Sequence, residues 1–579
     1  MGRAAVTHTG TMTAVQQCRA LPLAAAALLA FACTAPRAGG AQPAAGAAPA
    51  YVTGDEALDG LRPYLFPTLD ANRKSFAGVT GPVRGFGAGE IYPQVWLRDS
   101  ATLIPLARYT HGREYLVSWI EEHLAHQSPT GELFDWIAAG PAPEFKDNAP
   151  RVREVFRAGG VVVSADRNTS ETDQESSAVD AAAQVVAITG DSAWLSRRLR
   201  GRTVLQRLDQ ALRFVQARYL DAPTGLVTSA FTADWGDVSP VYGDQRVIYR
   251  DDRTPVVVGV YTNALFYRAA RALAGLHRRA GQRAAAARWD RDADRVRAAM
   301  QRHLWQEERG FFRMHVPVAG PAPPPIDDSN FFGLGGNALA LLYGVADERQ
   351  VARVAEVAER RQRSSGIATI AGVLVPPYPR GVFRHPILSE PFTYQNGGQW
   401  DWFAGRFLLA EFERGEAERA RAQLRAVAAR VVRSRGLYEW VTRHGQGQGS
   451  ARYAGSAGAL GAALFAGLFG IDLRAERLDI RVRLGDHPRG EVRVHQPATG
   501  TWVEYLYLHD PRARTMTVTF ASNAAGRGSL GLLLPAGATP AGARLGDRVQ
   551  AFRLETVGRD RYVVVDTAWA RERLVVSLR

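Results

Sequence analysis

Between residues 50 and 472 the apolar positions recur at the spacing of an amphipathic helix. In a series of segments, apolar residues stand at i, i+3, i+4 and i+7, and these segments tend to come in pairs joined by short loops. They are 101–127, 176–191, 204–220, 261–281, 397–432 and 455–471. Longer stretches rich in Gly, Pro and Asp separate them at 138–175, 222–256 and 310–335, and we interpret these as long loops. The pattern predicts roughly ten to twelve helices.

After Ile471 the period changes from helical to two. Stretches such as GEVRVHQ, WVEYLYLHD and TMTVTFAS alternate apolar and polar residues, with Gly, Pro and Asn between them. This pattern is typical of a small antiparallel β-sandwich, which we place at 473–579. The segment carries few residues suited to chemistry, so we expect it to have a packing role.

The N-terminus has the features of an export signal. Arg19 precedes an apolar run at 21–33, and small residues follow as far as Ala41. We therefore expect a signal peptide over 1–41, a linker over 42–55 and a periplasmic or extracellular protein. Cys33 at the end of the run is a candidate lipid anchor. Both cysteines lie in this leader, so we expect the mature chain to contain no disulfide, and no later segment has the length and apolar character of a membrane helix.

Length and charge change the picture little. The 579 residues are 46% hydrophobic and 22% charged, which is the composition of a globular protein with a large core. The formal net charge is +14, but the basic residues are mostly Arg interspersed with acids at helical spacing. Because nucleic-acid binding requires clustered positive charge, we do not expect it here. We expect a monomer.

Three segments place acids beside aromatic rings. They are VWLRDSA with Trp96, Arg98 and Asp99, TADWGDVSP with Asp234, Trp235 and Asp237, and GLYEW with Tyr438 and Glu439. Taken singly, Asp99 reads as a helix cap and Glu439 as a solvated acid. Taken together, they suit a sugar site, because flat rings stack on pyranose faces and charged groups bind hydroxyls. Cleavage of a glycosidic bond takes two carboxyl groups, and an apolar ring beside one of them favours its protonated form.

These segments resemble motifs of a family. VWLRDSA is similar to the WxRDSA segment of glucoamylases, and DWGDVSP resembles the GWDxSP segment of processing α-glucosidases, trehalases and glycogen-debranching enzymes. The segments at 394–410 and 437–464 resemble the pocket-lining helix start and the late Glu segment of the same enzymes. The resemblance covers about residues 60–470 and implies a mainly α fold: an (α/α)6 toroid over 56–472, followed by the small β-sandwich.

The resemblance also implies roles for individual residues. Asp237 matches the general acid, with Asp234 as the alternative, and Glu439 matches the general base. Arg98 and Asp99 would hold the terminal sugar. The other residues expected to bind substrate are Trp96, Trp235, Asn396, Gln399, Trp400, Trp402 and Tyr438. Asp173 and Glu175 stand at a helix entry, where they serve either as an N-terminal acid cluster or as ligands of a sugar hydroxyl.

We therefore predict an exo-acting glycoside hydrolase that inverts the anomeric centre and acts on α-glucosides such as an oligosaccharide, a glycogen branch or trehalose. Inversion requires the two carboxyls to lie about 6.5–9.5 Å apart, which leaves room for a water. No cofactor is expected, and the His residues show no metal-ligand spacing. The alternatives are a phosphorylase or polysaccharide lyase on the same toroid, and a sugar-binding surface protein without activity.

Overall fold

The computed structural model describes residues 48–141 and 154–579, which belong to one compact unit. The predicted signal peptide over 1–41 and the candidate lipid anchor Cys33 lie outside the described residues. Of the predicted linker, residues 50–52 form strand β1 (Ala50–Val52), which pairs with β21 (Arg489–Gln496). Among the described residues, no helix combines the length and the apolar character that crossing a bilayer requires.

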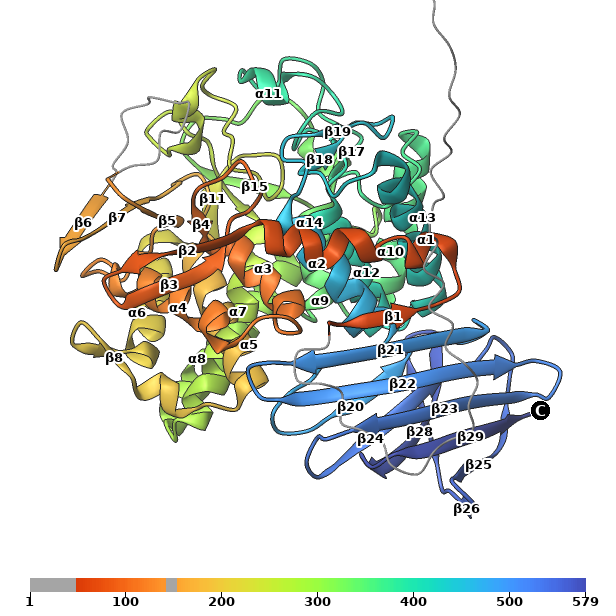
Figure 1. The fold of residues 1–579 in the computed structure, drawn as a ribbon. Coiled ribbons are helices and arrows are strands. Elements are labelled where there is room, and N and C mark those ends of the chain that lie inside the picture. Colours follow the sequence, from red (N-terminus) through yellow and green to blue (C-terminus); the bar gives the residue numbers. More distant parts are fainter. Residues whose placement is uncertain (1–47, 142–153) are drawn as a thin grey trace, which may run out of the picture. The chain divides into compact units, whose positions relative to one another are not determined.

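Six helices contact one another in a closed cycle, which we call the inner helices (Figure 1). In the order of the cycle they are α3 (Leu97–Ala107), α5 (Gln174–Thr189), α7 (Val260–Arg279), α9 (Leu334–Leu342), α12 (Asp401–Glu413) and α14 (Ala454–Ala462), which continues as the π-helical turn η4 (Ala463–Leu468). Several are buried on nearly all sides, as every residue of α14 is. An all-round apolar helix of this kind is expected where both of its faces meet protein.

Six further helices pack outside this cycle, each against one or two inner helices. They are α2 (Arg62–Ala71), α4 (Arg113–Ala125), α6 (Val204–Tyr219), α8 (Arg283–His303), α10 (Glu348–Ser364) and α13 (Ala417–Ser434). α10 shows why they lie outside, because it buries Val351, Val354 and Ala358 on one face and exposes its charged residues on the other. Reciprocal capping boxes fix the starts of α6 and α10. The remaining helices of the described residues are the short α1 (Glu56–Asp59) and α11 (Pro386–Ser389), together with the 3-10 turns.

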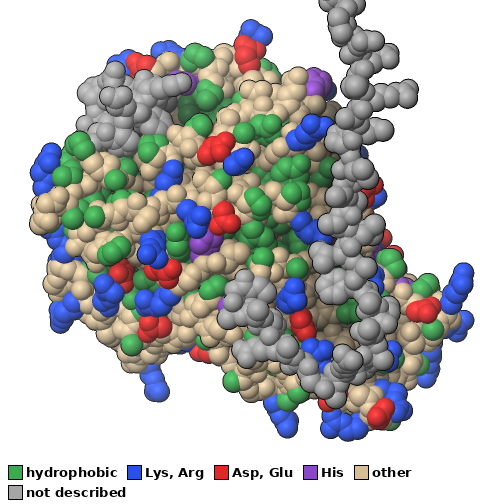
Figure 2. Space-filling view, viewed as in Figure 1, with side chains coloured by type: hydrophobic (Ala, Val, Ile, Leu, Met, Phe, Trp, Pro, Cys, Tyr) green, Lys and Arg blue, Asp and Glu red, His purple; other side chains and the backbone are tan. Residues whose placement is uncertain are grey.

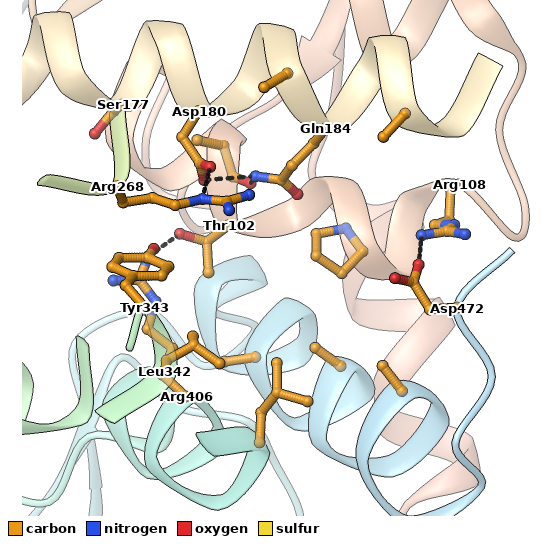
Figure 3. Close-up of a pocket in the computed structure, with 18 of the residues that line it drawn as sticks. Thr102, Arg108, Ser177, Asp180, Gln184, Arg268, Leu342, Tyr343, Arg406 and Asp472 are labelled. Atoms are coloured by element: carbon orange, nitrogen blue, oxygen red, sulfur yellow. Dashed lines mark hydrogen bonds and ion pairs between the residues drawn. The ribbon is translucent and has the colours of Figure 1, made fainter. Parts of the chain in front are cut away.

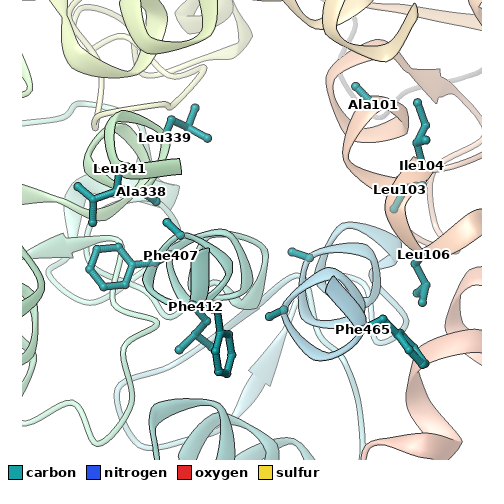
Figure 4. Packing of buried hydrophobic residues seen from close by; sticks show 14 of the residues in the cluster. Ala101, Leu103, Ile104, Leu106, Ala338, Leu339, Leu341, Phe407, Phe412 and Phe465 are labelled. Atoms are coloured by element: carbon teal, nitrogen blue, oxygen red, sulfur yellow. The ribbon is translucent and has the colours of Figure 1, made fainter. Parts of the chain in front are cut away.

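Small residues let the inner helices approach closely. A Cβ added at Gly405 of α12 would lie 2.4 Å from the backbone of Ala459 in α14, and one added at Gly458 would lie 2.9 Å from Leu103 in α3. Leu, Ile and Phe side chains of α3, α9, α12 and η4 fill the remaining space (Figure 4). The helix cycle thus depends on glycine where backbones meet and on large apolar side chains elsewhere.

Strands also occur throughout the helical region. One antiparallel sheet has the order β4 (Val95–Trp96), β5 (Trp136–Ala139), β7 (Val161–Asp166), β6 (Glu154–Ala158), and a second has the order β10 (Leu220–Asp221), β11 (Leu226–Ala230), β12 (Val256–Gly259), β15 (His315–Ala319). Two-stranded pairs are β2 (Arg73–Gly78) with β3 (Gly81–Phe86), β8 (Arg198–Leu199) with β9 (Arg202–Thr203), β13 (Trp305–Gln306) with β14 (Phe311–Phe312), β16 (Phe332–Gly333) with β17 (Leu374–Val375), and β18 (Trp440–Val441) with β19 (Gly447–Gln448). Strands of these two sheets lie within all three segments that were expected to be loops.

The C-terminal strands form two larger sheets. β21, β22 (Thr501–Asp510), β23 (Thr515–Ser522), β29 (Glu572–Leu578), β25 (Pro540–Leu545) and β26 (Arg548–Val549) follow β1 in a seven-stranded sheet, and β20 (Asp479–Val482), β24 (Arg527–Leu533), β28 (Asp560–Ala568) and β27 (Arg553–Val557) form a four-stranded one. β21 alternates buried and less buried residues along its length, as the period of two predicts. β20 and β24 run parallel, whereas an antiparallel arrangement was expected.

The predicted fold class, a mainly α toroid with a small β-sandwich, is therefore wrong. Of the described residues, 38% are helical and 27% are in strands, with sheets both among the helices and after them. The error has a physical source. Short strands between helices are set by pairing with distant segments, and runs such as VVVG at 256–259 have no period that separates a buried strand from a loop or helix.

On the face of the molecule in Figure 2, basic and acidic side chains are interspersed.

Candidate active site

A cavity of about 250 Å³ lies where several inner helices begin. The residues before α3, α12 and α14, which are Trp96, Trp400 and Tyr453, are all among its lining. The positive ends of these helix dipoles therefore face the cavity, where they stabilise negative charge. The other lining residues include Tyr92, Arg98, Asp99, Asp135, Trp136, Asp166, Asn168, Trp235, Asp237, Val238, Ile248, His385, Ile387, Tyr394, Gln395, Trp402 and Glu439.

The two acids of the segment TADWGDVSP lie in different environments. Asp234 has a left-handed backbone (φ 57°), and its Oδ2 accepts a hydrogen bond from the Gly336 amide at 2.9 Å, in the first turn of α9. It is not among the residues that line the cavity, and burial raises its pKa to about 6. Asp237 does line the cavity, and its Oδ1 accepts a hydrogen bond from Gln395 Nε2 at 2.8 Å. Of the two predicted acid candidates, Asp237 is the one in the cavity.

The second carboxyl of the cavity is held by a glycine loop. Glu439 Oε2 accepts from the Ser450 amide at 3.2 Å, and the Tyr92 hydroxyl lies 3.0 Å from both carboxyl oxygens. Gly449 has a left-handed φ of 68°, and a Cβ there would lie 2.4 Å from Glu439 Oε2. Burial raises the pKa of Glu439 to about 7, while the two hydrogen bonds act in the opposite direction. Near neutral pH this carboxyl can therefore both accept and release a proton.

Arg98 and Asp99 occupy the first turn of α3, beneath the cavity. Arg98 Nη1 pairs with Glu171 Oε1 at 2.7 Å and with Asp173 Oδ2 at 3.2 Å, and all three side chains are buried. Asp99 Oδ1 accepts a hydrogen bond from the Tyr453 hydroxyl at 2.8 Å. Burial raises the pKa of Asp99, with Arg98 acting against it. Arg98 thus lines the cavity, and the two acids that hold it, Glu171 and Asp173, lie behind the cavity wall.

Two strands of the first sheet add acids to the cavity. Asp135 precedes β5 and Asp166 ends β7, and both side chains line the cavity. Burial raises the pKa of Asp135 well above its usual range, Arg98 acts against this rise, and the nearby carboxyls of Asp173 and Asp99 add to it. Asp166 Oδ2 accepts a hydrogen bond from the Tyr249 hydroxyl at 3.2 Å. Such groups, ionised or protonated, can bind sugar hydroxyls from below.

Aromatic rings form much of the wall. Trp235 packs edge-on against Trp400 and Trp402, with ring centroids 4.8 and 5.4 Å apart, and lies 4.5 Å from Phe403. Trp235, Trp400 and Trp402 are 1–2% exposed, so they support the wall more than they offer open faces. Trp96 is half-buried and presents more of its ring. The tryptophan between the two acids of TADWGDVSP is therefore part of an aromatic support beneath the cavity.

Several predicted substrate ligands do not line the cavity. Asp173 lies behind Arg98, and Glu175 pairs with Arg167 at 2.6 Å. Asn396 binds backbone groups of the 378–390 loop, Gln399 binds Thr369 and Thr442, and Tyr438 lies beside Gly447. These side chains hold loops and helix starts in place.

Several lining residues escaped the sequence analysis. Asp135 and Trp136 form the same acid–aromatic pair as the recognised segments, a signal that could have revealed them. Tyr92 lies just before the VWLRDSA motif, and Gln395 adjoins the predicted Asn396. Asp166 and Asn168 had no such signal, because they reach the cavity through the pairing of β5 with β7.

A cavity with several carboxyls and aromatic walls is typical of a glycoside hydrolase, and the comparisons with known proteins place the chain in that class. The sequence profile described as the mannosylglycerate hydrolase MGH1-like glycoside hydrolase domain matches residues 92–456, more than half of the chain. The chain belongs to this family. None of the curated proteins matches it in sequence.

Solved structures share the fold at low identity. An α-L-rhamnosidase from Dictyoglumus thermophilum has a TM-score of 0.57 at 12% identity, over 92% of this chain and 50% of that one. A GH78 rhamnosidase of Bacillus sp. GL1 has a TM-score of 0.57 at 14% identity, over 84% and 43%. A GH63 mannosylglycerate hydrolase from Thermus thermophilus, in complex with Tris, has a TM-score of 0.50 at 18% identity, over 69% and 99%. The chain thus spans half or less of the two rhamnosidase chains.

Proposed function

We propose that the chain is an exo-acting glycoside hydrolase that inverts the anomeric centre. The observation that carries the proposal is that Asp237 and Glu439, which are far apart in sequence, line one cavity. Its volume of about 250 Å³ is below the roughly 300–1,000 Å³ of pockets for drug-sized ligands. A cavity of this size suits one terminal sugar, which supports removal of single units from a chain end.

In this proposal Asp237 is the general acid. Gln395 Nε2 holds one carboxyl oxygen of Asp237, so the other can carry the proton to the glycosidic oxygen as the bond to the anomeric carbon breaks. Glu439 is the general base and takes a proton from the water that attacks the opposite face. A pKa of about 7 suits this task, since a base works best when its pKa lies near the working pH.

Arg98, Asp99 and Asp135 are proposed to bind the hydroxyls of the terminal sugar, with Trp96 beside its ring. For the sugar itself we propose an α-linked glucose, as the resemblance to glucoamylases and trehalases implies. That finer relationship stays a prediction. Mannosylglycerate is a second candidate substrate, because the description of the family names a mannosylglycerate hydrolase.

A substrate panel tests the proposal. The purified chain is incubated with trehalose, maltooligosaccharides, mannosylglycerate and α-rhamnosides, with and without inorganic phosphate, and the products are separated by chromatography. We expect release of one free sugar without phosphate, and loss of that release in Asp237→Asn and Glu439→Gln. Dependence on phosphate would indicate a phosphorylase, unsaturated products a lyase, and saturable binding without turnover a sugar-binding protein. Wild-type turnover by both variants would refute the assignment.

We also propose that the protein acts outside the cytoplasm, following the leader expected over 1–41. The mass of the mature N-terminus tests this. A chain that begins at residue 42 supports a cleaved signal peptide, and a lipid-modified Cys33 supports an anchored form. An unprocessed Met1 in cells of the source would contradict export.

A further inference from the structure

A second cavity of about 250 Å³ lies inside the cycle of inner helices (Figure 3). All six inner helices contribute to its lining, for example through Thr102, Asp180, Arg268, Leu342, Arg406 and Ala459. Arg98 lines both this cavity and the catalytic one. We call it the axial cavity, and nothing in the proposed reaction uses it.

Ionic groups are unusually dense in this cavity. Five arginines line it, Arg98, Arg108, Arg268, Arg406 and Arg474, together with three acids, Asp180, Glu413 and Asp472. Asp180 pairs with Arg268 at 2.7 Å, and Asp472 is shared between Arg108 at 2.7 Å and Arg474 at 2.6 Å. Arg98 is neutralised from behind by Glu171 and Asp173.

Arg406 is left without an acidic partner within the described part of the chain. Glu413 lies on the same helix, but two turns further along, which is about 10 Å away along the axis. The Arg406 guanidinium lies 4.8 Å from the centroid of the Trp402 ring, and Nη2 donates to Thr102 Oγ1. Its Nη1 is buried and has no hydrogen-bond partner among the described residues. A buried donor without an acceptor is costly, so Nη1 of Arg406 favours a bound acceptor in this cavity.

A second guanidinium and a hydroxyl lie nearby. Arg268 uses Nε to bind Asp180, and its terminal nitrogens have no hydrogen-bond partner in residues 48–141 and 154–579. Its Cζ lies 5.6 Å from the centroid of the Tyr343 ring. Burial raises the pKa of Tyr343 to about 12, which keeps the hydroxyl protonated and able to donate. Figure 3 shows Arg268, Tyr343, Thr102 and Arg406 gathered at one end of the cavity.

From this arrangement we propose that the axial cavity binds a small oxyanion, with Arg406 and Arg268 as its cationic ligands and the Tyr343 hydroxyl as a further donor. Guanidinium groups present paired N–H donors that match the oxygens of phosphate and carboxylate. The cavity has room for inorganic phosphate or a short dicarboxylate. Both ions offer the guanidinium groups two or more oxygen atoms that carry a delocalised negative charge.

The site is connected to the catalytic cavity through one ring. Arg406 lies over Trp402 from the axial cavity, and Arg98 lies 5.4 Å from the centroid of the same ring. Trp402 is also part of the catalytic wall. Arg406 lowers the pKa of Asp99 through its charge, so an anion beside Arg406 raises that pKa. A bound oxyanion therefore changes sugar binding in the catalytic cavity without entering it.

Isothermal titration calorimetry on the full chain tests the proposal. Inorganic phosphate and malonate are titrated separately at constant ionic strength, with chloride as the control anion. We expect saturable binding of at least one of them, weakened tenfold or more in Arg406→Gln. Arg474→Gln is the matched control, because that arginine lines the same cavity but is already paired with Asp472, and it should bind within twofold of the wild type. Binding of phosphate alone or malonate alone identifies which oxyanion the site takes.

The proposal is overturned if neither anion binds saturably, if Arg406→Gln binds as well as the wild type, or if the bound anion is displaced by a sugar that occupies the catalytic cavity. Should Arg406→Gln fail to fold, crystals of the unmodified chain soaked in selenate give the same answer. An anomalous peak between Arg268 and Arg406 supports the site, and an axial cavity without such a peak refutes it.

Discussion

The hydroxyl of Tyr92 offers a direct way to perturb the proposed base. It lies 3.0 Å from both oxygens of Glu439, and burial raises the pKa of Tyr92 well above its usual range, so it stays a donor. Replacing it by Phe removes a hydrogen bond that favours the ionised carboxylate. The pKa of Glu439 should therefore rise.

The size of the shift follows from the geometry. A hydrogen bond to a charged group contributes about 1.5–3 kcal/mol, and one pKa unit corresponds to about 1.4 kcal/mol. Because one proton is shared between two oxygens, we take the lower end, a rise of about one unit from the present value of about 7. At pH 7 the ionised fraction of Glu439 should fall from about one half to about one tenth, so kcat/KM should drop roughly fivefold.

The assay is the pH profile of kcat/KM between pH 5 and 9.5 with the substrate found in the panel. A base must be ionised to act, so activity falls as the pH drops below the pKa of Glu439. In Tyr92→Phe this acid limb should move up by about one unit. Tyr453→Phe is the control, since it removes a hydrogen bond from Asp99 instead. If kcat/KM of Tyr92→Phe is lowered by the same factor at every pH and the acid limb stays at the wild-type pH, the reasoning is refuted.

Three further predictions concern the carboxyls and their supports. Asp237→Asn should lower kcat by about 10²–10⁴-fold. Asp234→Asn should keep most of the activity but lower the free energy of unfolding by about 1–2 kcal/mol. Initial rates and urea unfolding measure the two effects, and the reverse pattern would mean that Asp234 is the general acid. Gly449→Ala should lower kcat far more than Gly445→Ala. Both glycines have left-handed backbones, but only a Cβ at position 449 would contact Glu439. Equal losses of kcat would mean that backbone strain alone causes them. The folded-state pKa of Glu439, about 7, lies above its ordinary 4.5, so its protonation stabilises the fold and this contribution is lost as the pH rises to about 7. Glu439→Gln should therefore gain up to about 3 kcal/mol over the wild type between pH 5 and 8 in urea unfolding, and a constant difference would contradict the raised pKa.

Some residues that the motifs singled out lie together in the structure, whereas the predicted fold class is wrong. Asp237, Glu439 and Arg98 stand in motifs whose residue types are set by chemistry, and all three line one cavity. Asn396 and Gln399 stand in such a motif too, yet they bind backbone and loop residues. Polarity beside a motif does not show which way a side chain points.

The strands were missed for a different reason. The segment 138–175 was interpreted as a loop, but β5 ends in it and β7 lies within it, because Trp136 and its neighbours pair with residues about 30 positions away. Pairing over that distance leaves no local period in the sequence. Since β7 ends at Asp166, the same error concealed this acid of the cavity.

The central claim is that Asp237 and Glu439 act from opposite faces of one sugar and invert its anomeric centre. Proton NMR of the first turnovers, recorded before the free sugar mutarotates, tests it most directly. For an α-linked substrate the account predicts that the β-anomer appears first. First appearance of the α-anomer would mean retention through a covalent intermediate and would contradict the proposed roles of both carboxyls.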